Sequence, residues 1–214
     1  MKKLLLITIV SAFMTGNLVE AQIDKTKLSL EVTKKQEQNI KILSQYTWKR
    51  MLEGTCEGSL VLTTLASGTI GPDGKPVYQV IDKEAAPKSG TKKQTQKIEY
   101  IKQAVELASQ YIFMSTGQMV DLFNKGTLSE INNDMRVEAF GFIMKGDRIN
   151  LTLDKSSLNY VSQDISTLMN GDPVKAQVTY KMGNDVNTVD KVTLNLPAKK
   201  ISVTITNSEY AKKL

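Results

Sequence analysis

The chain has 214 residues, no histidine and a single cysteine, Cys56. Without an imidazole, neither a Ser–His nor a Cys–His nucleophile can form, and the usual zinc and copper sites lose their commonest ligand. One cysteine also excludes an internal disulfide and a four-thiolate zinc site. The composition, 41% hydrophobic and 23% charged, is that of a folded chain long enough to bury a sizeable core.

The N-terminus has the layout of a secretory signal peptide. A basic start at residues 1–3 precedes an apolar run at residues 4–13, and Val19 and Ala21 are small residues at the positions that a signal peptidase reads. We expect a signal peptide over 1–21 and a single mature domain over 22–214. The apolar run is too short to cross a bilayer, which needs about 20 residues. The protein is therefore expected to be periplasmic or secreted, with no transmembrane span after cleavage.

The formal net charge of +6 arises from lysines spread along the chain, with only three arginines, Arg50, Arg136 and Arg148. Nucleic-acid binding calls for a clustered basic patch, stacking aromatic residues and more arginine. Scattered lysines instead indicate a solvated surface. We therefore expect no nucleic-acid partner.

The N-terminal third predicts a helix followed by strands. Thr33 is a candidate helix N-cap with Gln36 as its capping-box partner. Residues 46–53 then alternate, with Tyr46, Trp48, Arg50 and Leu52 on one side, which favours a strand, although the helix could also continue through Leu52. Gly54 and Gly58 indicate a turn around Cys56.

A hairpin and two helices follow. The GPDGKP segment at 71–76 is a turn that joins strands over 59–66 and 77–81, and residues 85–90 form a loop. The strongest helical pattern covers residues 93–112, with apolar residues at three- and four-residue steps. A shorter helix fits residues 118–125, with Ser115 or Thr116 as its cap and Gly126 as a left-handed stop.

From Met135 onward, apolar and polar residues alternate in segment after segment, separated by turn residues. Alternation with short connections is typical of an antiparallel meander with one covered face. The sequence therefore predicts an α+β fold: a curved antiparallel sheet of about eight or nine strands, an unclosed half-barrel, with helices packed on its concave side. The expected strands of this part are 136–144, 148–153, 158–163, 174–180, 189–196 and 201–206.

Four segments, YTWKR (46–50), GPDGKP (71–76), IEYIKQAVELASQYI (98–112) and LPAKKISVTITNSEYAKKL (196–214), resemble an uncharacterised family of small exported bacterial proteins. The layout as a whole is similar to the outer-membrane lipoprotein carrier fold, LolA/LolB-like, in which a half-barrel wraps around helices and holds acyl chains. That resemblance implies a non-enzymatic carrier, and no functional residue is carried over from it. A cystatin-like or other curved-sheet scaffold could share the same string of elements.

Sites for catalysis or metal binding have weak support in the sequence. Carboxylates such as Asp82, Glu84, Glu130 and Asp134 could act as acid and base without histidine, but most lie in expected turns or beside lysines. Fragments such as 132–134 offer too few oxygens for a calcium loop. We expect no catalytic residues, no metal and no cofactor, with a carboxylate-based hydrolase as an open alternative.

The remaining candidate chemistry is apolar. Seven methionines of the expected mature chain and several large apolar residues could line a cleft between sheet and helices for a hydrophobic ligand, such as a lipid or the acyl chains of a lipoprotein. The same residues could instead pack a filled core, which would favour a structural or protein-interaction module of the cell envelope with an envelope protein as its partner. The expected cleft residues are Trp48, Ile101, Val105, Met119, Leu122, Phe123, Phe140 and Phe142.

Overall fold

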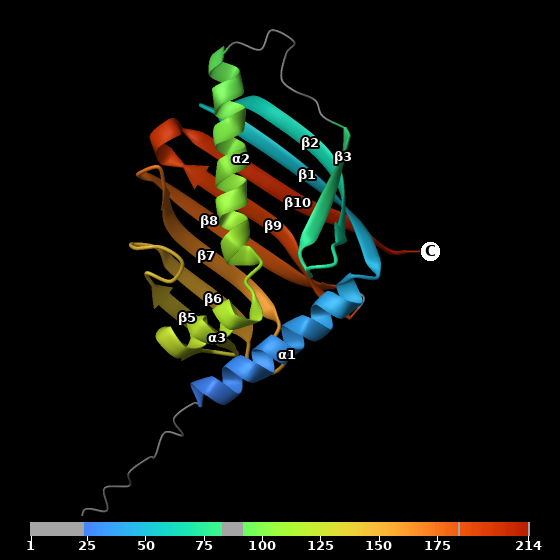
Figure 1. Cartoon of the computed structure of the whole chain (residues 1–214), viewed down its shortest axis with the longest axis vertical. Coiled ribbons are helices and arrows are strands. Elements are labelled where there is room, and N and C mark those ends of the chain that lie inside the picture. Colours follow the sequence, from blue (N-terminus) through green and yellow to red (C-terminus); the bar gives the residue numbers. More distant parts are fainter. Residues whose placement is uncertain (1–23, 83–91, 184, 214) are drawn as a thin grey trace, which may run out of the picture.

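A computed structural model describes residues 24–82, 92–183 and 185–213 (Figure 1). The expected signal peptide, its cleavage site and the loop over 85–90 lie outside the described residues. The helices are α1 (Lys25–Leu43), α2 (Lys92–Ile112), α3 (Thr116–Lys125) and a short 3-10 turn, η1 (Pro197–Lys199). The strands are β1 (Tyr46–Cys56), β2 (Ser59–Ile70), β3 (Pro76–Asp82), β4 (Thr127–Ile131), β5 (Asp134–Phe140), β6 (Arg148–Asp154), β7 (Tyr160–Met169), β8 (Asp172–Gly183), β9 (Val186–Leu196) and β10 (Ile201–Lys212).

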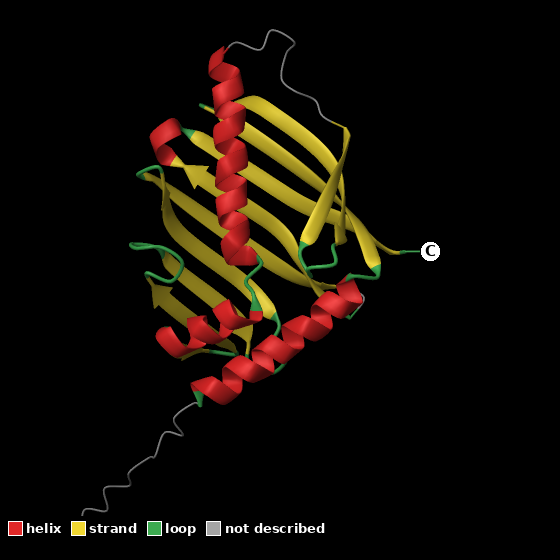
Figure 2. Ribbon diagram, in the orientation of Figure 1, coloured by secondary structure: helices red, strands yellow, loops and turns green. Residues whose placement is uncertain are grey.

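All ten strands form one antiparallel sheet in the order β3-β2-β1-β10-β9-β8-β7-β6-β5-β4. The sheet is curved and does not close, and the helices lie on its concave side (Figure 2). This confirms the predicted fold class. The one non-sequential pairing joins β1 to β10, which places the last strand in the interior of the sheet.

The core lies between the concave face and the helices. Along β6, Ile149, Leu151 and Leu153 are fully buried, and β8 and β9 show the same alternation of buried and exposed residues. Facing them, α2 and α3 bury Tyr111 and Phe123 completely. The helices thus cover one face of the sheet, and alternate residues of each strand point to that face and pack against them.

The predicted start of the first helix is wrong. Asp24 is the N-cap of α1, and its carboxylate accepts a hydrogen bond of 3.0 Å from the backbone of Lys27. Thr33 is buried in the middle of the helix. The buried face begins upstream, at Leu28 and Val32, so the apolar contacts extend the helix beyond the capping residues expected from sequence.

Three local predictions near glycines are corrected. The strand β1 continues through Cys56, and the turn falls on Glu57 and Gly58, which both have positive φ. Gly126 is extended (φ −76°, ψ 159°) and not left-handed, because the chain continues directly into β4, a strand that the sequence did not predict. The strand expected over 136–144 ends at Phe140, where Gly141 takes a φ of +59°.

The other predicted elements are confirmed, with longer strands at the C-terminal end. The helix α2 matches the expected span to within one residue, and the GPDGKP turn joins β2 to β3 as expected. The strands β7 and β10 each extend six residues past their predicted ends. Within the described residues, no helix is both long and apolar enough to cross a membrane.

The interior of β2 depends on a glycine at position 68. An added Cβ there would lie 2.9 Å from Trp48 Cζ2 and closer still to Cε2 and Nε1. The indole cannot move away easily, because it is stacked on Tyr210 at 5.6 Å and meets Tyr78 edge-on at 6.2 Å.

We predict that Gly68→Ala lowers the free energy of unfolding by about 1 to 3 kcal/mol, because the methyl group overpacks a fixed indole. Urea denaturation followed by tryptophan fluorescence would measure this loss. Gly117→Ala is the control, since no atom lies within 4 Å of its added Cβ. Equal stabilities of the two variants would contradict the prediction.

Candidate functional site

A cavity of about 670 Å³ lies between α2 and the three strands β1, β2 and β3, which we call the wing. Most of its walls are apolar carbon atoms from the inner face of the wing and from one side of α2. The described lining residues are Arg50, Leu52, Leu62, Thr64, Ala66, Lys75, Pro76, Tyr78, Val80, Ile101, Lys102, Val105, Glu106, Ser109, Gln110, Phe113 and Gln118.

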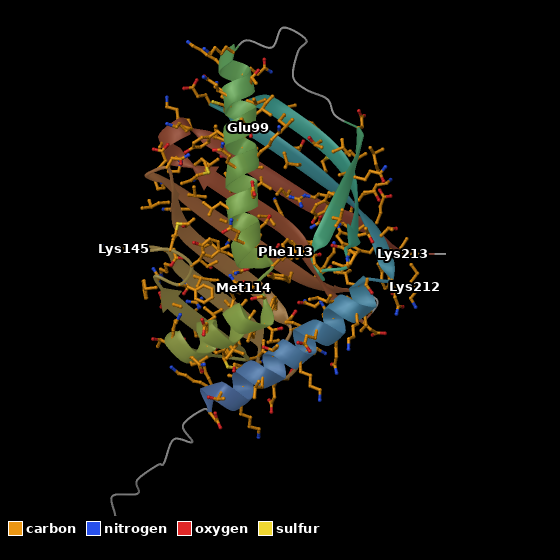
Figure 3. The ribbon with its side chains drawn as sticks, viewed as in Figure 1. Glu99, Phe113, Met114, Lys145, Lys212 and Lys213 are labelled. Carbon is orange, nitrogen blue, oxygen red and sulfur yellow. The ribbon has the colours of Figure 1, made fainter. Side chains whose placement is uncertain are left out.

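Strand register puts the wing residues on one face. Arg50 is paired with Ala66, and Ala66 in turn with Val80, so these three residues of neighbouring strands point to the same side of the sheet. At Gly54 the helix comes close, because an added Cβ would lie 2.7 Å from Ile101 Cδ1. Phe113 follows the last residue of α2 and closes the opposite end of the helical wall (Figure 3).

The C-terminal end of α2 is fixed by the carboxylate of Asp147, a residue only 1% exposed. Its oxygens accept hydrogen bonds from the backbone N–H groups of Phe142 (2.5 Å), Ile143 (2.8 Å) and Met144 (2.9 Å), and from Tyr111 Oη (2.8 Å). Four donors therefore compensate the burial of this charge without a cation.

Two residues of β7 complete the attachment of Tyr111. Because its single phenolic proton goes to Asp147, Thr167 Oγ1 is the donor in the 3.1 Å contact with Tyr111 Oη. Gln163 Nε2 donates to the backbone carbonyl of Tyr111 at 2.8 Å. Burial is the main cause that raises the pKa of Tyr111, so its hydroxyl stays protonated and remains a donor.

Nearer its N-terminus, α2 is held by a more exposed contact. Tyr100 Oη donates to Asp172 Oδ2 at 2.8 Å, and Lys199 Nζ lies 3.1 Å from the same oxygen. The hydrogen bond from Tyr100 is the largest cause that lowers the pKa of Asp172, and Lys199 is the next. Burial, followed by the hydrogen bond to Asp172, raises the pKa of Tyr100 to about 12. The middle and the C-terminal end of α2 are thus attached to the sheet, the C-terminal end by buried groups.

The cavity has cationic groups and one carboxylate among its described lining residues. Arg50 lies on the floor, with Cζ 4.0 Å from the centroid of the Tyr78 ring, and Lys75 and Lys102 are exposed at the rim. Glu106 is the single acidic residue of this lining. The cavity therefore does not bring together two carboxylates, which an acid–base hydrolase would need.

Six of the eight expected cleft residues separate into three groups. Ile101 and Val105 line the cavity. Trp48 is buried beside it, packed against Tyr78. The three residues expected on the second helix, Met119, Leu122 and Phe123, are 4% exposed or less and belong to the core under α3.

The expectation that Phe140 faces the helices is wrong. It is 70% exposed, because Met135, Val137 and Ala139 occupy the inner positions of β5 and Phe140 lies on the other face, near Arg148. Phe142 lies beyond the end of β5, half-buried against the core. No methionine is among the described lining residues.

Several lining residues were not singled out as cleft residues from the sequence. The alternation of residues 46–53 puts Leu52 and Arg50 on the Trp48 side of their strand, so it contains the information needed to find them. Tyr78 and Val80 could be found only from the hairpin register. Cys56 is buried, its Sγ 3.7 Å from the Lys199 carbonyl oxygen, and the described residues hold no cluster of three or more metal-ligating side chains.

No family model and no curated protein matches this sequence. The structure is similar to that of a DUF1329 family protein from Desulfovibrio piger, with 10% identity, coverage of 89% of this chain and 94% of that chain, and a TM-score of 0.47. It is also similar to a LolA superfamily protein from Nitrosomonas europaea, with 7% identity, coverage of 87% and 94%, and a TM-score of 0.40. Neither likeness identifies a ligand, so the function has to be inferred from the residues of the cavity.

We predict that Asp147→Ala lowers the free energy of unfolding by about 3 kcal/mol or more, because buried backbone donors and Tyr111 lose their acceptor. Urea denaturation would measure the loss. Asp172→Ala at the other, exposed attachment of α2 is the matched control and should cost much less. A similar loss in both variants would show that Asp147 is not the principal attachment of α2.

Proposed function

We propose that this protein is an exported, non-enzymatic carrier that binds the apolar chain of a lipid or of a lipoprotein in the cavity between α2 and the wing. The observation that carries the proposal is the cavity itself, about 670 Å³ in volume and walled mainly by aliphatic and aromatic groups. Pockets for small apolar ligands have volumes of about 300 to 1,000 Å³ with a few polar groups, as here.

The energetics favour a long chain over a small apolar molecule. Each buried methylene contributes about 0.8 kcal/mol. Association costs about 4 to 15 kcal/mol in lost translational and rotational freedom. About 5 to 19 methylenes are therefore needed to offset that cost, which a small apolar molecule does not provide and a long acyl chain does.

Access to the cavity is easiest between β3 and α2. The helix is attached to the sheet at its middle and at its C-terminal end, whereas β3 is an edge strand that bonds only to β2. Val80 and Ile81 on this strand are 55% and 58% exposed. In the proposed mechanism the ligand replaces water along this side, the cavity shields its chain, and transfer follows when a partner offers a better apolar site.

The alternative is an interaction module with a filled core. The cavity between α2 and the wing favours the carrier over this alternative. Its remaining support is the edge of β3, whose unpaired backbone groups and exposed Val77 could pair with a strand of an envelope protein. A failure of ligand binding in the following test would favour this alternative.

The test compares two valines of β3 on opposite faces of the strand. Val80 lines the cavity and Val77 points outward, and they are 55% and 51% exposed. We predict that Val80→Asp lowers the affinity for the neutral fluorescent probe N-phenyl-1-naphthylamine at least about tenfold, because a carboxylate would be desolvated by the bound probe. Val77→Asp should bind like the wild type. Fluorescence titration of protein freed of lipid by organic extraction and refolding measures both.

A second readout identifies the natural ligand class. Mass spectrometry of an organic extract, from protein purified without detergent out of a bacterial periplasm, should detect a stoichiometric lipid that is absent from Val80→Asp and present in Val77→Asp. If Val80→Asp and Val77→Asp both bind the probe like the wild type, and the extract of the wild type contains no lipid, the proposal is overturned.

A further inference from the structure

The arginine on the cavity floor has no anionic partner. Arg50 is half-buried on the inner face of β1, and none of the ion pairs or side-chain hydrogen bonds of the described residues includes its guanidinium. Its contact is with the face of the Tyr78 ring. Arg148, by comparison, forms an ion pair with Glu138.

Stability does not account for this charge. A guanidinium partly withdrawn from water without a carboxylate loses solvation, and the contact with the Tyr78 ring offsets only part of that loss. The register neighbour of Arg50 on β2 is Ala66, and two positions along β1 lies Leu52, so an apolar residue would continue the surrounding wall.

A second polar group without a partner lies beside Arg50. Asn207 is its register neighbour on β10 and is only 4% exposed. Its Nδ2 donates to the Val189 carbonyl at 3.0 Å, but its buried Oδ1 has no hydrogen-bond partner. Both residues line a small recess of about 20 Å³ that also borders Tyr78 and Ser109.

The cavity therefore differs between its two ends. Ile101 and Leu62 lie together at one end, where the helix comes closest to the sheet at Gly54. Arg50 and Ser109 lie at the other. Along α2, eight residues separate Ile101 from Ser109, which corresponds to about 12 Å. An apolar end and a cationic end at this separation match a molecule that has a chain and an anionic head.

The rim has the same preference for negative charge. Lys75 and Lys102 are both exposed there, and the single carboxylate of the described lining is Glu106. Lys102 is paired with Glu99 at 3.2 Å, whereas no ion pair of the described residues includes Lys75. A cationic rim raises the local concentration of anionic ligands.

We propose that the ligand is an anionic amphiphile, a single apolar chain with a carboxylate or phosphate head, and that Arg50 binds the head inside the cavity. This inference rests on the proposed function and specifies its ligand. The chain lies along Val105 toward Ile101, and the head accepts hydrogen bonds from the guanidinium, whose planar donors suit both kinds of oxygen anion.

The test measures displacement of N-phenyl-1-naphthylamine at pH 8 by three C16 ligands, hexadecanol, hexadecanoate and hexadecyl phosphate, from wild type and Arg50→Gln. Wild type should prefer the anions to the alcohol. Arg50→Gln should lose about tenfold to a hundredfold in affinity for the anions and keep its affinity for hexadecanol, since a hydrogen bond to a charged group is lost. The anion that the wild type binds more tightly relative to hexadecanol identifies the head that fits the site better.

Two control variants separate a binding role from a change in folding or in net charge. Arg136→Gln removes an exposed arginine on the outer face of β5 and should bind all three ligands like the wild type. Arg50→Lys should keep part of the preference for anions. If hexadecanol binds and Arg50→Gln weakens all three ligands equally or none, the anionic head is disproved while the carrier stands. If hexadecanol and both anions fail to bind, the carrier itself is disproved.

Discussion

The buried carboxylate of Asp147 fixes α2 over the concave face, and the cavity exists because the helix is held there. Its four hydrogen bonds connect the turn after β5 to Tyr111, and through Tyr111 to β7. A helix held only by apolar contacts would settle onto the wing and fill the space with its own side chains. The polar attachment instead keeps the Val105 side of α2 apart from the inner face of β1 and β2.

Local pattern was enough to predict most elements, whereas the site depends on register and distant contacts. The apolar steps of α2 and the Pro-Asp-Gly turn depend on short spacings, which a single sequence displays. The pairing of β1 with β10 leaves no local trace, and it decides which residues face α2. Val105 and Leu122 both lie in amphipathic helices, yet Val105 lines the cavity and Leu122 is in the core. The alternation of β5 misplaces Phe140 when its parity is read the wrong way, because Met135, Val137 and Ala139 are the residues that face inward.

The lining of the cavity combines two requirements that oppose each other. An apolar wall attracts a chain through the loss of water-exposed area, while a guanidinium within that wall is costly until an anion arrives. Placing Arg50 over Tyr78 lowers that cost by letting the ring face the cation. Proteins commonly tolerate such locally unfavourable groups where binding needs them, and the extensive hydrogen bonding around Tyr111 supplies stability elsewhere.

The position of β10 has a consequence for the order of assembly during synthesis. The wing is made early, but β1 gains its second partner only after β10 appears, since 147 positions separate Thr55 from Ser202. At ribosomal rates of about 5 to 20 residues per second, this gap lasts roughly 7 to 30 s. Throughout that interval the edge of β1 and the apolar face around Leu52 and Leu62 are uncovered, a condition that favours aggregation. Pairing of β10 with β1 is therefore the step that removes this exposed edge from the folding chain.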